Sequence, residues 1–285
     1  MNLEKNDPER IEAVLLRNGA LSVTLTDAGD DPVLEPAPGE TPLWNETRIS
    51  ALLDADADIP ALKDDLRHSL DLVELPPNQV ETIADRAWER EWLKDFGPMR
   101  FGERLWIVPG DAESPGNDAV VVRLDPGLAF GTGTHPTTAL CLEWLDGLDV
   151  SGKTVLDFGC GSGVLSVAAC KLGAIFVEGI DIDLQAVTAS RQNALHNDVG
   201  DRFRAGTARQ DDQSPFDIVI ANILAGTLID YSETLRDAVK SGGKLALSGV
   251  LSEQVNAVRD AFHEWFDFEP PAIKDNWARL TGTKR

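Results

Sequence analysis

The chain has 285 residues, 42% of them hydrophobic, which is enough for one large domain or two unequal domains with at least one real core. The charged residues 1–10 and the lack of any run near the ~18 apolar residues of a membrane helix argue against a secretory signal and a membrane span, so we expect a cytoplasmic protein. The net charge of −22 argues against direct nucleic-acid binding. It would favour encounter with a basic protein partner, but it is equally consistent with solubility or adaptation to salt and indicates no function by itself.

Short alternating elements in residues 1–80 predict a small α+β domain. Apolar residues recur at helical spacing over residues 9–17, whereas residues 20–26 alternate as a strand does. A turn-rich stretch follows, and then a second strand. The last two elements that we expect are a helix over residues 59–70 and a strand near residues 71–75.

Residues 81–97 are predicted to form a helical linker between this small domain and the rest of the chain. The helix ends at Gly97 and Pro98, which stop helices. Trp88 and Trp92 lie one turn apart, and we interpret them as packing at the domain junction.

Strands and helices alternate through residues 98–285, which predicts a doubly wound α/β domain with a mostly parallel sheet. Such a sheet binds ligands at the carboxyl ends of its strands. Besides two strands near the C-terminus, the predicted strands are residues 104–109, 119–124, 154–158, 175–181, 202–205, 216–223 and 244–249.

The sharpest motif is a glycine-rich turn after the strand over residues 154–158, with a helix from Val164 behind it. Glycine allows the backbone to turn sharply and to approach a ligand closely. The spacing G-x-G-x-G at Gly159, Gly161 and Gly163, preceded by Asp157, differs from the G-x-G-x-x-G of dinucleotide enzymes and resembles the first motif of class I methyltransferases.

Two acidic residues follow the next strand. We assign Asp181, at the end of that strand, to the hydroxyls of a ribose, because a carboxylate can accept two hydrogen bonds there. Asp183 is better placed to cap the helix from Leu184. Asn222 ends the apolar strand over residues 216–223, and we favour a functional role for it over that of a turn former.

A loop rich in glycine and threonine leads to a helix that we expect to begin at Pro136. Hydroxyls and free N–H groups at that helix start would bind an anion such as a carboxylate, with Thr134 and Thr138 as candidates. His135 is interpreted as a cap more readily than as a base.

The three cysteines predict neither a disulfide framework nor a metal site, because they are few and form no C-x-x-C pair. We interpret Cys160 as a small filler of the glycine turn, not as a nucleophile.

Taken together, these motifs resemble those of the family of methyltransferases of ribosomal protein L11, over essentially the whole chain. The long glycine-threonine loop is far more specific than the glycine turn. The shared segments are W-E-R-E-W-L-K-D-F (88–96), R-F-G-E-R-L-W-I (100–107), L-D-P-G-L-A-F-G-T-G-T-H-P-T-T (124–138), D-F-G-C-G-S-G (157–163), G-I-D-I-D (179–183), A-N-I-L-A (221–225) and W-A-R-L-T-G (277–282).

The resemblance implies a ferredoxin-like recognition domain joined to a Rossmann-like catalytic domain, and methylation by S-adenosylmethionine of lysine side chains and the N-terminal amine of L11. Our hypothesis for the mechanism is a metal-free direct transfer in which Asn222 orients the amine. A monomer is expected. Implied or candidate cofactor contacts are Phe130, Thr134, Thr138, Asp157, Gly159, Gly161, Asp181 and Asn222.

Two features depart from the family pattern: the short segment before the first helix, and Thr227 where the family tends to have proline. Three alternatives stay open, namely a methyltransferase acting on another amine, an NAD-linked oxidoreductase of the same fold, and a non-catalytic ribosome-assembly module. The early third glycine argues against the oxidoreductase, and the complete motif set argues against the non-catalytic module.

Overall fold

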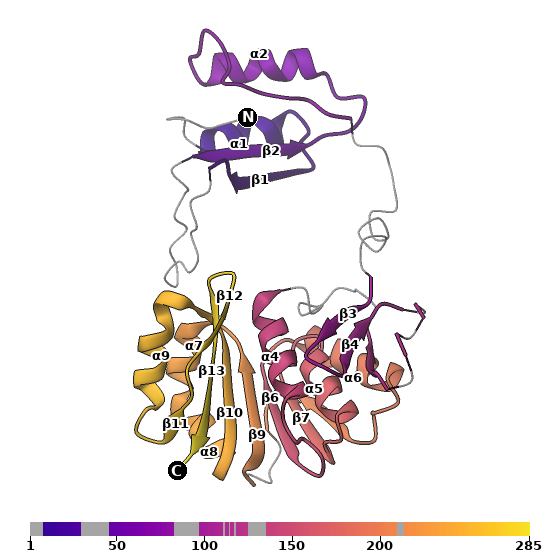
Figure 1. Ribbon diagram of the computed structural model, residues 1–285. Helices are drawn as coiled ribbons and strands as arrows, with labels where there is room; N and C mark the ends of the chain where they lie inside the picture. The colour runs from indigo at the N-terminus through magenta and orange to yellow at the C-terminus, as the bar shows by residue number, and fades with distance from the viewer. Residues whose placement is uncertain are drawn as a thin grey trace. The chain divides into compact units, whose positions relative to one another are not determined.

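The computed structural model describes residues 8–29, 46–82, 97–110, 112–113, 115–116, 118–124, 135–209 and 214–285. The chain divides into two compact units, Met1–Arg86 and Ala87–Arg285 (Figure 1). Most of the predicted linker, like the loop before Pro136, lies outside the described residues. Among those that are described, no helix is both long and apolar enough to cross a membrane.

The first unit packs two helices against a two-stranded antiparallel sheet. Its elements are α1 (Pro8–Arg17), β1 (Ser22–Asp27), β2 (Thr47–Leu52) and α2 (Ile59–Ser69), close to the predicted bounds. Exposed positions alternate with half-buried ones along β1 and with buried ones through most of β2, so one face of the sheet is covered and the other is open. The buried core consists of Ile11, Val14, Leu15, Ile49, Leu62, Leu66 and Leu70.

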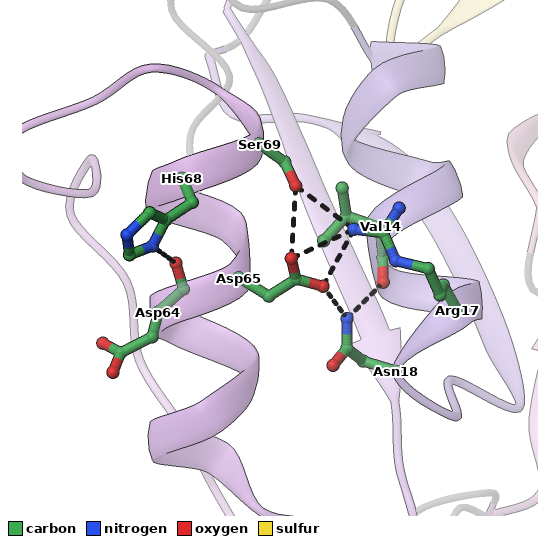
Figure 2. A network of polar contacts seen from close by, with 7 residues as sticks. All are labelled: Val14, Arg17, Asn18, Asp64, Asp65, His68 and Ser69. Carbon is green, nitrogen blue, oxygen red and sulfur yellow. Dashed lines mark hydrogen bonds and ion pairs between the residues drawn. The ribbon is translucent and has the colours of Figure 1, made fainter.

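A polar network joins the end of α1 to α2 (Figure 2). The Arg17 guanidinium donates to both carboxylate oxygens of Asp65, at 3.0 and 2.9 Å, and to the Ser69 hydroxyl at 3.2 Å. The Asn18 amide donates to Asp65 at 2.6 Å and to the Val14 carbonyl at 2.9 Å. These bonds, that of Arg17 first, lower the pKa of Asp65, so the carboxylate ties the two helices together at neutral pH.

The predicted strand near residues 71–75 is wrong. The chain closes α2 with a turn in which the Leu72 N–H donates to the Arg67 carbonyl at 2.9 Å, and Asp71 takes a positive φ of 54°. Leu72 and Leu75 still pack on the core, partly buried. Their spacing therefore reflects burial without strand pairing.

The second unit is built on a twisted sheet of eight strands in which β10, β9, β6, β7 and β8 run parallel. The strand order is β11-β13-β10-β9-β6-β7-β8, with β12 paired to β13. The bounds are β6 (Thr154–Phe158), β7 (Phe176–Ile180), β8 (Phe203–Gly206), β9 (Phe216–Asn222), β10 (Val239–Leu251), β11 (Phe266–Phe268), β12 (Ala272–Lys274) and β13 (Trp277–Lys284).

Helices cover both faces of this sheet, as the alternation predicted (Figure 1). Alternate residues of each buried strand enter opposite cores: Val155 packs with the first group of helices and Leu156 with the second. The first group is α4 (Pro136–Asp146), α5 (Val164–Lys171) and α6 (Leu184–His196); the second is α7 (Ala225–Asp230), α8 (Ser232–Ala238) and α9 (Val255–Phe262). A short 3-10 turn, η2 (Ser252–Gln254), precedes α9.

Two predictions differ from the structure, one in the number of C-terminal strands and one in the sheet to which two strands belong. The C-terminus has three strands instead of two, and the predicted strands 104–109 and 119–124 belong to a separate three-stranded sheet. That sheet contains β3 (Met99–Phe101), β4 (Leu105–Val108) and β5 (Val120–Arg123). It is held to α4 by buried Asp146, whose Oδ2 accepts from the backbone N–H groups of Glu103 and Arg104 at 2.6 and 3.2 Å.

Candidate functional site

The candidate site lies where the strand order reverses. β6 and β9 are neighbours in the sheet although α5, β7, α6 and β8 lie between them in the chain, and the helices that follow β6 and β9 cover opposite faces. A crevice forms outside the carboxyl ends of strands at such a switch point. β6 ends at Phe158, directly before Gly159, and β9 ends at Asn222. The topology therefore brings the glycine turn and the asparagine to one edge.

The glycine turn is held tightly against the end of β7. The N–H groups of Gly159 and Cys160 both donate to the Ile180 carbonyl, at 2.7 and 2.9 Å. Gly159 has a φ of +79°, and a β-carbon there would overlap the side chain of Ile223, the residue after Asn222. Glycine is thus required both for the turn and for the close approach of the β9 end.

Asp157 lies beneath this turn, buried and only half paired. Its Oδ2 accepts from the Ser166 hydroxyl at 2.6 Å, whereas its Oδ1 has no hydrogen-bond partner in the described part of the chain. Burial raises the pKa of Asp157 to about 6, against hydrogen bonds from the Ser166 hydroxyl and the Ser166 backbone N–H, which lower it. A buried carboxylate with a vacant acceptor is suited to a cationic or N–H group of a ligand.

Asp181 is fixed by two backbone donors. Its Oδ2 accepts from the Gly161 N–H at 2.9 Å and its Oδ1 from the Asp183 N–H at 3.0 Å. Each carboxylate oxygen has a further lone pair, so the group can still accept from a ligand hydroxyl. The Asp183 side chain accepts from the Gln185 N–H and caps α6, which confirms the role predicted for it.

Asn222 meets the first turn of α4 across this edge. The Asn222 Nδ2 donates to the Oγ1 of buried Thr138 at 3.3 Å. With the amide so placed, its Oδ1 is left to accept, and the Thr138 hydroxyl retains its proton to donate. The two residues come from segments far apart in the sequence, and the fold places them in direct contact.

His135 caps α4, as predicted. Its Nδ1 accepts from the Thr137 N–H at 3.4 Å and lies 2.7 Å from the Thr137 hydroxyl. The ring packs edge-on against Trp277 of β13, with centroids 4.9 Å apart. Phe130 and Thr134, two expected cofactor contacts, lie outside the described residues. Cys160 is buried, and burial raises the pKa of its thiol well above the ordinary range, which fits a filler and not a nucleophile.

Two residues at this edge escaped the sequence analysis. Ile182, between the two acids, is 93% exposed, an unusual position for a large apolar side chain beside a ligand-binding turn. Ser248 is fully buried on β10, opposite Asn222 in the parallel ladder. The acidic flanks of Ile182 could have signalled it, whereas nothing in the sequence around Ser248 marks it. No group of three or more His, Cys, Asp or Glu that could hold a metal occurs among the residues described.

Comparison with known proteins identifies one family over the whole chain. The family model described as "Ribosomal protein L11 methyltransferase (PrmA)" matches residues 1–285. Proteins named ribosomal protein L11 methyltransferase from Shewanella sediminis and Shewanella baltica are 49% and 50% identical, over 100% of this chain and 98% of each relative.

A solved structure is similar as well. The crystal structure of a ribosomal protein L11 methylase from Lactobacillus delbrueckii subsp. bulgaricus shares 32% identity, with a TM-score of 0.61. It covers 67% of this chain and 100% of that one. The similarity thus extends over both the sequence and the three-dimensional fold.

Proposed function

The chain belongs to the ribosomal protein L11 methyltransferase family, and on this premise we propose that it transfers methyl groups from S-adenosylmethionine to lysine side chains and the N-terminal amine of ribosomal protein L11. The observation that carries the proposal is the contact between Asn222 and Thr138 beside the glycine turn. It joins a group suited to an acceptor amine with one suited to the cofactor.

The cofactor would be held by residues from four segments. Gly159 and Gly161, both at positive φ, would present backbone without side chains to it, and Asp181 would accept from its ribose hydroxyls. The vacant Oδ1 of Asp157 would accept from its ammonium group, and Thr138 would donate to its carboxylate. Phe130 and Thr134 remain expected contacts. When bound, S-adenosylmethionine supplies an electrophilic methyl group, and the protein's task is to hold an amine in line with it.

Ile182 extends this site with an apolar surface. Its exposed side chain directly follows Asp181, so a flat apolar group attached to the ribose would cover it. Covering exposed apolar area stabilises a bound ligand by about 25 cal/mol per Å². We therefore assign Ile182 to the base of the cofactor.

Asn222 would receive the acceptor amine. Its Nδ2 is engaged with Thr138, so its Oδ1 can accept a hydrogen bond from an amine N–H and aim the nitrogen lone pair at the methyl carbon. A lysine amine has a pKa near 10.4 in water, and burial beside a positive charge lowers that value. The amine can then lose its proton to solvent without a dedicated base. His135 is accordingly not needed as a base, which agrees with its role as the cap of α4.

The other parts of the chain are assigned as follows. Residues 1–80 would recognise the protein substrate, residues 81–97 would link, and residues 98–285 would catalyse. The strongly acidic chain would attract a basic ribosomal protein and repel RNA, so we propose a cytoplasmic monomer that binds L11 without contacting nucleic acid.

The deciding experiment is incubation of the full chain with radiolabelled S-adenosylmethionine and purified L11, followed by mass spectrometry. Mass added in steps of one methylene on lysine or the N-terminal amine is the expected result. Cofactor binding without transfer to L11 would refute the substrate and point to another amine. Lack of cofactor binding would refute the proposal as a whole.

A further inference from the structure

We propose that Ser248 is a positioning residue for methyl transfer, which locks the first turn of α4 to the end of β9 and thereby aims Asn222. The inference rests on the proposed function, in which Asn222 orients the acceptor amine. The Ser248 side chain is fully buried and its hydroxyl donates to a backbone carbonyl of the protein, so we assign it no direct contact with the cofactor or the substrate. Its effect must pass through the residues that it contacts.

The sheet register directs Ser248 and Asn222 to the same side. The two residues are partners in the parallel pairing of β10 with β9. Side chains of partner residues in neighbouring strands point to the same face. Both side chains accordingly reach the first turn of α4, where Asn222 donates to the Thr138 hydroxyl and Ser248 donates to the Thr137 carbonyl at 3.1 Å.

Ser248 is therefore hydrogen-bonded to the peptide group that joins Thr137 to Thr138. The Ser248 hydroxyl has a single proton. The Thr137 carbonyl at 3.1 Å is nearer than the Ala278 carbonyl of β13 at 3.5 Å, and the Cys141 thiol is a further partner of the hydroxyl. The Thr138 Cα, which bears the Thr138 side chain, directly follows this peptide group. A shift of that peptide would move the Thr138 hydroxyl away from Asn222.

The backbone of Ser248 holds the other partner. Its carbonyl accepts from the Ile223 N–H at 3.2 Å, so the residue next to Asn222 is fixed by the same serine. The ladder of β10 with β13 is irregular between Leu247 and Val250, and Gly249 has a φ of +81°. A β-carbon on Gly249 would overlap the Ile223 backbone, so this bulge allows the end of β9 to approach β10.

One buried serine thus binds both segments whose contact defines the amine position. Its hydroxyl fixes α4 and its carbonyl fixes β9. If the hydroxyl is removed, the hydrogen bond that holds the first turn of α4 near the end of β9 is lost, and the Asn222–Thr138 contact can shift. Gly159 and Asp181 remain in place to hold the cofactor. The defect should therefore appear in turnover and not in cofactor affinity.

The test compares Ser248→Ala with Ser248→Thr, which keeps the hydroxyl. A misplacement of this kind predicts a loss of kcat between about tenfold and hundredfold for Ser248→Ala. The dissociation constant for S-adenosylmethionine should rise by less than about threefold, because of its expected contacts only Thr138 and Asn222 are adjacent to the change. Ser248→Thr should keep most of the kcat. Thr281→Val is the matched control, since the buried Thr281 hydroxyl donates at 3.1 Å to Glu269, away from this edge, and its removal should leave kcat unchanged.

A double-mutant cycle separates positioning from stability. Ser248→Ala should reduce kcat in the wild-type background but have little further effect in the Asn222→Ala background, because its route to the reaction is then gone. An equal loss in both backgrounds, or an unchanged kcat in Ser248→Ala, overturns the proposal. If Ser248→Ala does not fold, Ser248→Cys, of similar size and with a weak donor, takes its place in the cycle with the same expected result.

Crystals of wild type and Ser248→Ala with S-adenosylhomocysteine provide a readout that needs no protein substrate. The distance from Asn222 Nδ2 to Thr138 Oγ1, 3.3 Å here, should lengthen in the variant. An unaltered pair refutes the role of Ser248 even in an active enzyme. A lengthened pair supports it even if wild type transfers nothing to L11, so failure of this inference and failure of the proposed function are distinguishable.

Discussion

The pH dependence of cofactor affinity is the most direct consequence of the half-paired Asp157. Its buried carboxyl has a pKa of about 6, and its vacant Oδ1 is assigned to the ammonium group of S-adenosylmethionine. Only the ionised form can pair with that cation, so protonation competes with binding. Because the pKa of this acid is raised, the ionised form is present above pH 6 and is lost as the pH falls through that value.

The magnitude follows from the titration curve. At pH 7 about nine-tenths of Asp157 is ionised and at pH 5 about one-tenth, so the dissociation constant should rise about tenfold between these values. Isothermal titration calorimetry of the substrate-free protein with S-adenosylmethionine at pH 5, 6, 7 and 8 measures it. The steepest change should lie between pH 5 and 6, and the affinity should level off towards pH 7.

Two variants make the assignment specific. Asp157→Asn keeps the shape but not the charge, and it should bind weakly at pH 7 and lose the dependence between pH 5 and 7. Asp217→Asn is the control, because Asp217 lies near the opposite ends of the strands and its pKa is about 2, so it does not titrate in this range. A flat affinity in wild type, or a wild-type profile in Asp157→Asn, would refute the reasoning.

Three further predictions concern Gly249 in the bulge of β10, the exposed Ile182 after β7, and Asp217 near the amino end of β9. Gly249→Ala should destabilise the protein by about 2–4 kcal/mol and reduce turnover more than tenfold. The residue has a positive φ, which disfavours alanine, and the added β-carbon would overlap the Ile223 backbone. Gly242→Ala is its matched control: φ is +73° but nothing lies within 4 Å of the new carbon, so urea unfolding should show a cost of about 1 kcal/mol with turnover intact. Ile182→Ser should weaken cofactor binding several-fold without changing the melting temperature, whereas Leu195→Ser, also at an exposed residue (69%), should leave the affinity unchanged. Equal affinities for wild type and Ile182→Ser would remove Ile182 from the site. For Asp217, burial raises the pKa but hydrogen bonds from Thr154 and Lys240 outweigh it and lower the pKa to about 2. The resulting stability is present above pH 4 and is lost as the pH falls through 2, so Asp217→Asn should cost about 1–2 kcal/mol in urea unfolding at pH 7, and a cost that does not shrink at low pH would contradict the ion-pair explanation.

Most of the catalytic fold could be predicted because its signals are local. A strand that is buried on both faces is a short apolar run, and β6 was predicted residue for residue. Helix starts announce themselves through their caps, as with His135 before Pro136 and Asp183 before Leu184. The glycine turn needs positive φ values, which restrict its sequence to glycine.

The errors have one physical origin. Residues 71–75 look like a strand because Leu72 and Leu75 are both drawn to the core, but a strand also needs a partner with free backbone groups. The apolar pattern reports burial and is silent on pairing. For the same reason β3 was missed and the separate sheet of β3, β4 and β5 could not be distinguished from the main one.

The sequence alone determined which chemistry the chain can perform, because the glycines, the acids and Asn222 each carry a local requirement. Only the tertiary structure decided how they act together. Strand order and register determine the contact of Asn222 with Thr138 and the vacant oxygen of Asp157. They also determine the two hydrogen bonds by which Ser248 holds α4 and the end of β9. Strand order and register are set by the packing of the whole sheet, since a shift of one residue would turn each side chain to the opposite face.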